Sequence, residues 1–192
     1  MEILIILLLI LLNGLFSMSE VSLINSRKSS LQVEAKKGSK TAKTVLDLID
    51  NPTNFLSTVQ IGITLIGILT GMFSGASIAV DLSELFQKWG MAASVAAPLA
   101  QTVIVVIVTL LTIILGELVP KKIGMSSSEK IARVISGPML FLSWLTKPFV
   151  WLLSKSTDGI VKLLGIKEQE ANVTEEEIKS MIAEGAEDGE VQ

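Results

Sequence analysis

The run Gly116-Glu-Leu-Val-Pro120 holds the residues best suited to chemistry within an apolar part of the chain. Glu117 is a carboxylate after a long uncharged stretch, and Pro120 lacks the N–H that would bond the carbonyl of Gly116 in an α-helix. We expect the helix to be kinked or widened around Gly116, which frees a carbonyl oxygen beside a carboxylate. Such oxygens suit hard cations, Mg²⁺ or Ca²⁺. The alternative is that Glu117 sits at the membrane interface, paired with Lys121 at i+4.

A polar face on the first apolar segment is the second such feature. Asn13, Ser17 and Glu20 follow i, i+4, i+7 spacing, which puts them on one side of a helix. Ser19 lies on the flank of this face. Polar groups inside a membrane cost free energy unless a partner satisfies them, so they mark candidate functional positions. The alternative is a face that only packs against another helix.

A polar stripe that turns into a glycine stripe runs along the second apolar segment. It consists of Gln60, Thr64, Gly67, Gly71 and Gly75. The three glycines form two successive small-xxx-small units, which let helix backbones approach closely in lipid. We expect these glycines to serve helix packing, within one chain or between subunits.

The composition narrows the possible chemistry. The 192 residues are 49% hydrophobic and include no Cys and no His. Disulfides, thiol chemistry, imidazole bases and the usual zinc or copper ligand sets are thereby excluded. Any metal must be held by oxygen. An intramembrane hydrolase is poorly supported, because the apolar segments contain no pair of aspartates, and we expect no enzymatic activity.

Three apolar segments are long enough to cross the ~30 Å of hydrocarbon in a bilayer as helices. They are residues 3–24, 55–80 and 93–119. A cleaved signal peptide is the alternative for the first, but Glu2 stands where a basic region is expected and no Ala-x-Ala-like site follows. We therefore expect three transmembrane helices in an all-α membrane protein.

Charge sets the expected orientation. Residues 27–51 carry six bases and three acids, and Lys- and Arg-rich loops stay in the cytoplasm, so the N-terminus is expected outside. The short acidic loop 81–91 suits the outer face, and Lys121 and Lys122 return to the inner one. Residues 168–192 hold nine of the nineteen acids and one base. This split indicates an acidic aqueous extension and argues against nucleic acid as a partner.

Residues 134–153 are apolar but contain Gly137, Pro138, Lys147 and Pro148. The nine residues between the prolines rise only about 14 Å as a helix, too little to span a bilayer. We expect a re-entrant or interfacial helical hairpin here, because irregular backbone is tolerated where protein buries it. A fourth full span is the alternative, and it would put the acidic extension outside.

The predicted organisation is a transmembrane domain at 1–153 and cytoplasmic juxtamembrane helices at 154–192. The first of these helices is amphipathic and is expected to lie on the inner membrane surface. The second is acidic and opens near Thr174 with a capping-box pattern. The last residues carry no stop signal, so we expect a further cytoplasmic domain to follow them.

Three stretches together resemble the transmembrane domain of the CorC/CNNM family, in its prokaryotic type. They are NGLFSMSE at 13–20, NPTNFLSTVQIGITL at 51–65 and GELVPK at 116–121, and the resemblance covers about residues 1–165. It implies a secondary Mg²⁺ transporter, an exporter coupled to Na⁺, that forms a homodimer in a prokaryotic plasma membrane with a cytoplasmic C-terminus. A Mg²⁺-sensing membrane anchor or regulator that does not itself transport is the alternative.

The resemblance also implies a binding site. Ser17, Glu117 and the Gly116 carbonyl would hold a dehydrated or partly dehydrated Mg²⁺ between helices. The positions along an ion pathway, or on the polar face that supports it, would be Asn13, Ser19, Glu20, Thr58, Gln60, Gly62 and Thr64. Family members continue into a CBS-pair domain that binds nucleotide, so ATP is expected only through a domain outside these residues.

Overall fold

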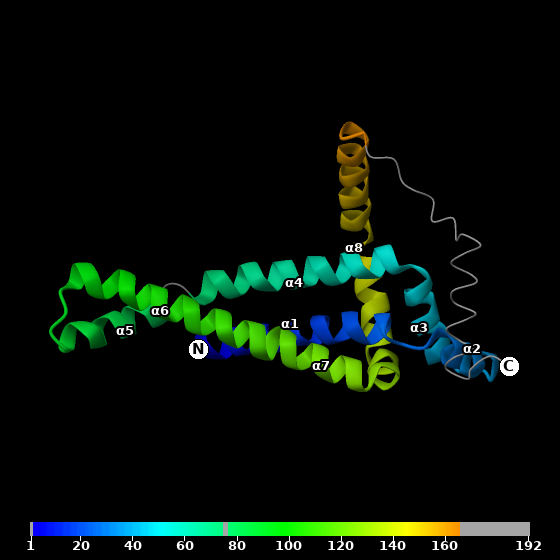
Figure 1. The fold of residues 1–192 in the computed structure, drawn as a ribbon, viewed down its shortest axis with the longest axis horizontal. Helices are drawn as coiled ribbons and strands as arrows, with labels where there is room; N and C mark the ends of the chain where they lie inside the picture. The colour runs from blue at the N-terminus through cyan, green and yellow to red at the C-terminus, as the bar shows by residue number, and fades with distance from the viewer. Residues whose placement is uncertain (1, 75–76, 166–192) are drawn as a thin grey trace, which may run out of the picture. The chain divides into compact units, whose positions relative to one another are not determined.

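The computed structural model describes residues 2–74 and 77–165 (Figure 1). In this part of the chain the regular elements are all helices, and no strand is found. The chain divides into two compact units, Met1–Trp151 and Leu152–Gln192. All of the packing described below lies within the first unit.

Three stretches have the length and apolar character of membrane spans, Ile3–Ile24, Pro52–Lys88 and Ala93–Ser126. The three predicted spans are therefore confirmed, and the chain is a multi-pass membrane protein. The second stretch contains two helices, α4 (Pro52–Ser74) and α5 (Ser77–Lys88).

The second and third spans extend further than predicted. Because α5 runs to Lys88, most of the expected loop 81–91 is helical, and the chain turns at Gly90, which has a φ of 92°. The third span begins with α6 (Ala93–Ile113) and continues through a π-helical segment, η1 (Ile114–Leu118), into α7 (Val119–Ser126).

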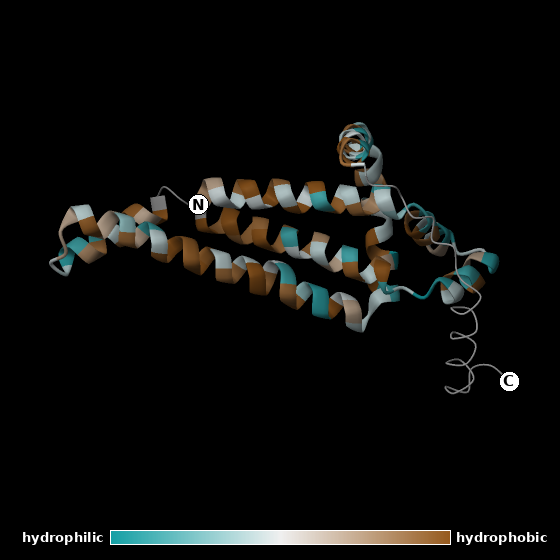
Figure 2. Cartoon of the chain, turned by 45° about the horizontal axis from the view of Figure 1, so that its top comes forward, coloured by the Kyte–Doolittle hydropathy of each residue, from teal (hydrophilic) through white to brown (hydrophobic). Residues whose placement is uncertain are grey.

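The first span, α1 (Glu2–Ile24), lies between α4 on one side and the third span on the other (Figure 1). Two glycines set these close approaches. A Cβ on Gly62 would lie 2.6 Å from the Phe16 ring, and one on Gly124 would lie 2.9 Å from the carbonyl oxygen of Met18. On the other sides, Leu and Ile side chains of α1, α4 and α6 are exposed, as expected for surfaces that face lipid (Figure 2).

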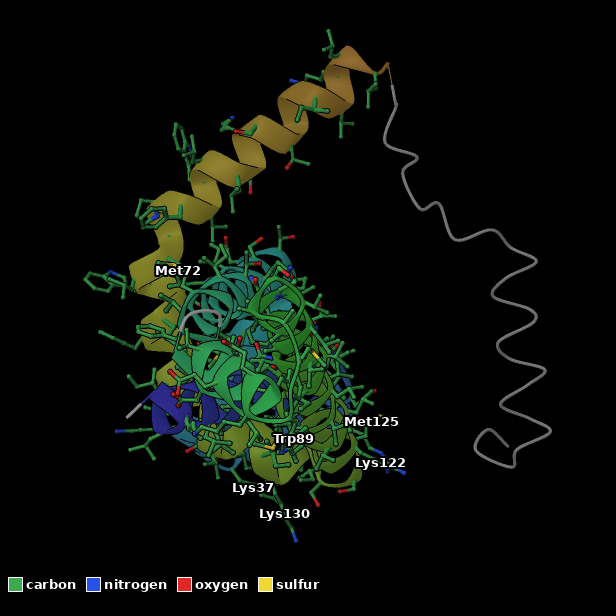
Figure 3. The ribbon with its side chains drawn as sticks, turned by 90° about the vertical axis from the view of Figure 1, so that its left-hand side faces the viewer. Lys37, Met72, Trp89, Lys122, Met125 and Lys130 are labelled. Atoms are coloured by element: carbon green, nitrogen blue, oxygen red, sulfur yellow. The ribbon has the colours of Figure 1, made fainter. Side chains whose placement is uncertain are left out.

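Two short helices form the polar connector after α1, namely α2 (Lys28–Lys36) and α3 (Lys40–Asp50). Hydrophilic residues gather here (Figure 2). Beneath them, Leu31, Val45 and Leu48 are buried in the main hydrophobic cluster together with Ala132 and Ile135. The basic side chains of the connector are exposed. Figure 3 shows Lys122 and Lys130, which lie later in the chain, pointing away from the bundle.

The expected hairpin at 134–153 is not found. One helix, α8 (Ser128–Leu163), runs through the whole segment with Pro138 and Pro148 inside it. The sequence argument treated each proline as a helix end, whereas an internal proline removes one backbone hydrogen bond and the flanking bonds can carry the helix on with a kink. The amphipathic helix expected from 154 is the end of α8, and the acidic helix expected near Thr174 lies outside the described residues.

The partly buried Arg133 anchors α8 to the connector. Its Nη2 donates to Glu34 Oε1 at 2.7 Å and to Glu129 Oε2 at 3.3 Å. Ser30 Oγ donates to the same oxygen of Glu129, also at 3.3 Å. The partly buried ion pairs therefore join α2 to the start of α8 above the shared hydrophobic cluster.

Gly124→Ala should lower the stability of the detergent-solubilised protein by about 1 to 3 kcal/mol, because the new methyl would press on backbone of α1. Thermal unfolding followed by circular dichroism measures this change. Gly67→Ala is the matched control, since a Cβ at Gly67 meets nothing within 4 Å and Ala favours the helix. Equal melting temperatures for the two variants would contradict the close contact between α1 and α7.

Candidate metal centre

The π-helical segment η1 lies where the sequence predicted a distortion before Pro120. The backbone N–H of Val119 donates to the carbonyl of Ile114, five residues back. Pro120 follows within the first turn of α7 and has no N–H for the carbonyl of Gly116. Single π turns of this kind are frequent at functional sites. The wide turn presents Gly116, which is buried, toward α1.

Asn13 of α1 satisfies the carbonyl of Gly116. Its Nδ2 donates to that oxygen at 3.0 Å in a buried hydrogen bond. The contact requires a residue without a side chain at 116, because a Cβ there would lie 3.2 Å from both Asn13 Nδ2 and the Ile10 carbonyl oxygen. The first and third spans are therefore joined at the π turn by one amide-to-carbonyl bond.

Two buried oxygens near this bond have no hydrogen-bond partner among the residues that the structure describes. They are Asn13 Oδ1 and Ser17 Oγ, and their residues are 6% and 1% exposed. The two residues are one helical turn apart on α1, on the face that packs against η1 and α7. A buried oxygen without a partner costs about 1 to 3 kcal/mol, so native proteins rarely keep one without a function. Both oxygens are neutral ligands of the type that Mg²⁺ accepts.

Glu117 does not reach into this buried pair. Its side chain is 46% exposed, and its Oε1 accepts from Lys121 Nζ at 2.8 Å. This is the interfacial pairing that the sequence left open as an alternative for Glu117. Within residues 2–74 and 77–165, no group of three or more Asp or Glu side chains gathers to hold a metal. The candidate centre thus consists of neutral oxygens with one carboxylate alongside.

The remaining polar positions do not gather at η1. Ser19 Oγ donates to the carbonyl of Leu15 at 2.6 Å within its own helix, and Glu20 is half-buried. Thr58 Oγ1 lies 2.8 Å from Thr146 Oγ1 of α8. The other three positions lie on α4: Gly62 packs against Phe16, and the exposed Gln60 donates to the exposed Thr64 at 3.5 Å.

Among the described residues, the space beside Gly67 and Gly71 is open. A Cβ on Gly67 or Gly71 would meet nothing within 4 Å, and both residues line a groove of about 340 Å³ between α4 and α6. Gly75 lies outside the described residues. Packing between subunits stays a prediction for this face.

Sequence reasoning missed the contact between Ser22 and Gly124. Ser22 Oγ donates to the Met18 carbonyl at 2.6 Å and approaches the Gly124 carbonyl oxygen at 3.4 Å. The sequence analysis also treated Asn13 as part of a polar face without identifying the Gly116 carbonyl as its hydrogen-bond partner. The signal that could have revealed the contact between Ser22 and Gly124 is the spacing of Gly116 and Gly124, which lie about two helical turns apart on the third span.

The sequence of the chain matches one protein family and is similar to several bacterial proteins. The family model described as the cyclin M transmembrane N-terminal domain matches residues 4–192. The UPF0053 protein sll0260 of Synechocystis is 45% identical over 190 residues, which cover 98% of this chain and 42% of that protein. The polyamine export protein of Haemophilus influenzae is 32% identical over 182 residues, which cover 94% and 42%. The chain thus spans about two fifths of the length of these relatives.

Ser17→Ala should leave the melting temperature of the metal-free protein unchanged or raise it, because the variant removes an oxygen that lacks a partner. Thermal unfolding in EDTA measures this. Ser22→Ala is the matched control, a buried serine on the same helix that does lose hydrogen bonds, and it should melt lower. If Ser17→Ala lost as much stability as Ser22→Ala, Ser17 Oγ would have a partner in the folded protein.

Proposed function

Because the chain belongs to the family of cyclin M transmembrane N-terminal domains, we propose that it is the membrane part of a secondary Mg²⁺ transporter. Export coupled to Na⁺ is the direction that the family resemblance favours. The observation that carries the proposal is the pair of buried oxygens without partners in the described part of the chain, on Asn13 and Ser17, next to the buried π turn at Gly116. A cation is the partner that such oxygens lack.

Ser17 Oγ, the Gly116 carbonyl and Glu117 are the proposed ligands. In the structure the Asn13 amide donates to this carbonyl and Lys121 pairs with this carboxylate. Mg²⁺ therefore competes with two internal donors. Glu117 supplies the one negative charge. When Mg²⁺ replaces Lys121 at this carboxylate, the end of the third span rearranges locally, so cation binding is coupled to a conformational change. Water completes the octahedral shell that Mg²⁺ demands.

We further propose a plasma-membrane protein with its N-terminus outside and its C-terminus in the cytoplasm, assembled as a homodimer with one cation site per subunit. The basic connector α2–α3 and the lysines of α7 support this orientation. The relatives are more than twice as long as this chain. We infer that ATP acts through parts of the longer family proteins that these residues do not include.

Export of an organic polycation is a second candidate, because one relative is named a polyamine export protein. Ammonium groups can donate hydrogen bonds to Asn13 Oδ1 and Ser17 Oγ, the same oxygens that could coordinate a metal ion. Space argues for the metal ion: a Cβ on Gly14 would lie 2.9 Å from Pro120 Cγ, so α1 and the third span leave little room for a carbon chain. A Mg²⁺ sensor that does not transport is the third candidate.

Glu117→Gln should abolish Mg²⁺ binding, because it leaves the dication with neutral ligands only. Lys121→Met should tighten binding several-fold, because it removes the cation that competes for the carboxylate. Titration calorimetry on the purified protein measures both. Lys122→Met is the matched control, an adjacent exposed lysine that points away from the bundle (Figure 3). Unchanged affinity in Glu117→Gln would exclude this carboxylate from the site.

Flux distinguishes the three candidates. Proteoliposomes loaded with Mg²⁺ should lose it faster when Na⁺ is supplied outside, and Glu117→Gln proteoliposomes should not. Spermidine flux without Mg²⁺ flux would support the polyamine candidate. Mg²⁺ binding without any flux would support the sensor.

Single cysteines test the orientation, since the chain has no natural one. Trp89→Cys, at the exposed turn between α5 and α6, should react with an impermeant maleimide added to intact cells. Lys37→Cys, in the connector, should react only after the membrane is opened. The reverse pattern would invert the proposed topology.

A further inference from the structure

A groove of about 670 Å³ lies where α3, the start of α4 and α8 meet. Buried Leu48 and Phe55 contribute apolar surface to it, and Leu140, Phe141 and Trp144 contribute exposed apolar surface. Trp144 is 70% exposed and Phe141 is 62% exposed. The groove therefore exposes large aromatic surface that the described part of the chain does not cover.

Polar groups of both charges also line the groove. Asp47 and Lys147 bring opposite charges, and Asn51 and Asn54 bring amides. Neither Asp47 nor Lys147 forms an ion pair within the described part of the chain. Ser143 also lines the groove, and its Oγ is buried without a hydrogen-bond partner. A lysine that can bind an anion, an aspartate that can bind a cation and a serine hydroxyl without a described partner thus line one apolar groove.

The groove borders the start of the second candidate span, because this span begins at Pro52, between Asn51 and Asn54. We therefore place the groove at the edge of the membrane. Trp side chains favour the level of the lipid headgroups, where one end of the ring is apolar and the other is wet. An occupant at this depth meets water on one side and hydrocarbon on the other.

We propose that this groove binds one phospholipid with a zwitterionic headgroup that carries a primary ammonium, a phosphatidylethanolamine. The ammonium donates to the Asp47 carboxylate, and the phosphate accepts from Lys147 and from Ser143 Oγ. The acyl chains lie along the exposed aromatic wall of α8. This binding is independent of the Mg²⁺ site at η1.

Charge excludes the other common classes of occupant. An anionic lipid would match Lys147 but place its charge near Asp47, and a polyamine would meet Lys147 with like charge. A choline headgroup carries no N–H and cannot donate to Asp47. The pair of opposite charges therefore selects for a headgroup with an N–H cation and a phosphate together.

Native mass spectrometry of the full chain tests the proposal. The protein is reconstituted in equimolar phosphatidylethanolamine, phosphatidylglycerol and phosphatidylcholine, and the lipid retained on each chain is counted. We expect one phosphatidylethanolamine per chain, and at least a fivefold loss of this adduct in both Asp47→Asn and Lys147→Gln. Lys43→Gln and Asp81→Asn, exposed positions outside the groove, are the matched controls and should retain the lipid.

Thermal unfolding of the wild-type chain gives a second measurement that needs no variant to fold. Phosphatidylethanolamine should raise the melting temperature above the values in phosphatidylcholine or phosphatidylglycerol. Equal retention of the three lipids, retention that both groove substitutions leave intact, or displacement of the lipid by spermidine would overturn the proposal.

Discussion

A backbone carbonyl inside a membrane needs a hydrogen-bond donor, and the carbonyl of Gly116 loses its usual one because Pro120 has no N–H. The chain meets this constraint with a side chain from another span, the amide of Asn13. One end of that amide is thereby fixed, and its Oδ1 is left buried without a partner. The candidate site thus follows from the hydrogen bond that the Gly116 carbonyl of the distorted third span requires inside the membrane.

Small residues make this arrangement possible. Gly14, Gly116 and Gly124 each stand where a Cβ would press on the facing helix. The first and third spans consequently pack closely along the whole stretch that holds Asn13 and Ser17. Such packing holds the buried side-chain oxygens of Asn13 and Ser17 in place, which makes them suitable ligands for a small, partly dehydrated cation.

Sequence reasoning located the three spans and the distortion before Pro120, because hydropathy and proline chemistry act locally along the chain. It left the pairing of Glu117 with Lys121 open as an alternative, and it did not foresee that Asn13 donates to Gly116. That hydrogen bond depends on which faces of two helices share the interior. The continuous α8 was missed for a related reason, since the neighbours that let a helix continue through Pro138 are not visible in its own sequence.

The central claim is that a divalent cation binds at the π turn, and anomalous scattering from crystals of the full chain soaked in Mn²⁺ tests it most directly. Mn²⁺ prefers the same oxygen ligands as Mg²⁺ and has an anomalous signal that locates it. The account predicts one Mn²⁺ peak per chain within ~2.3 Å of the Gly116 carbonyl oxygen and Ser17 Oγ. Peaks confined to surface carboxylates such as Glu34 or Glu129, with the bond between Asn13 and Gly116 intact, would contradict it.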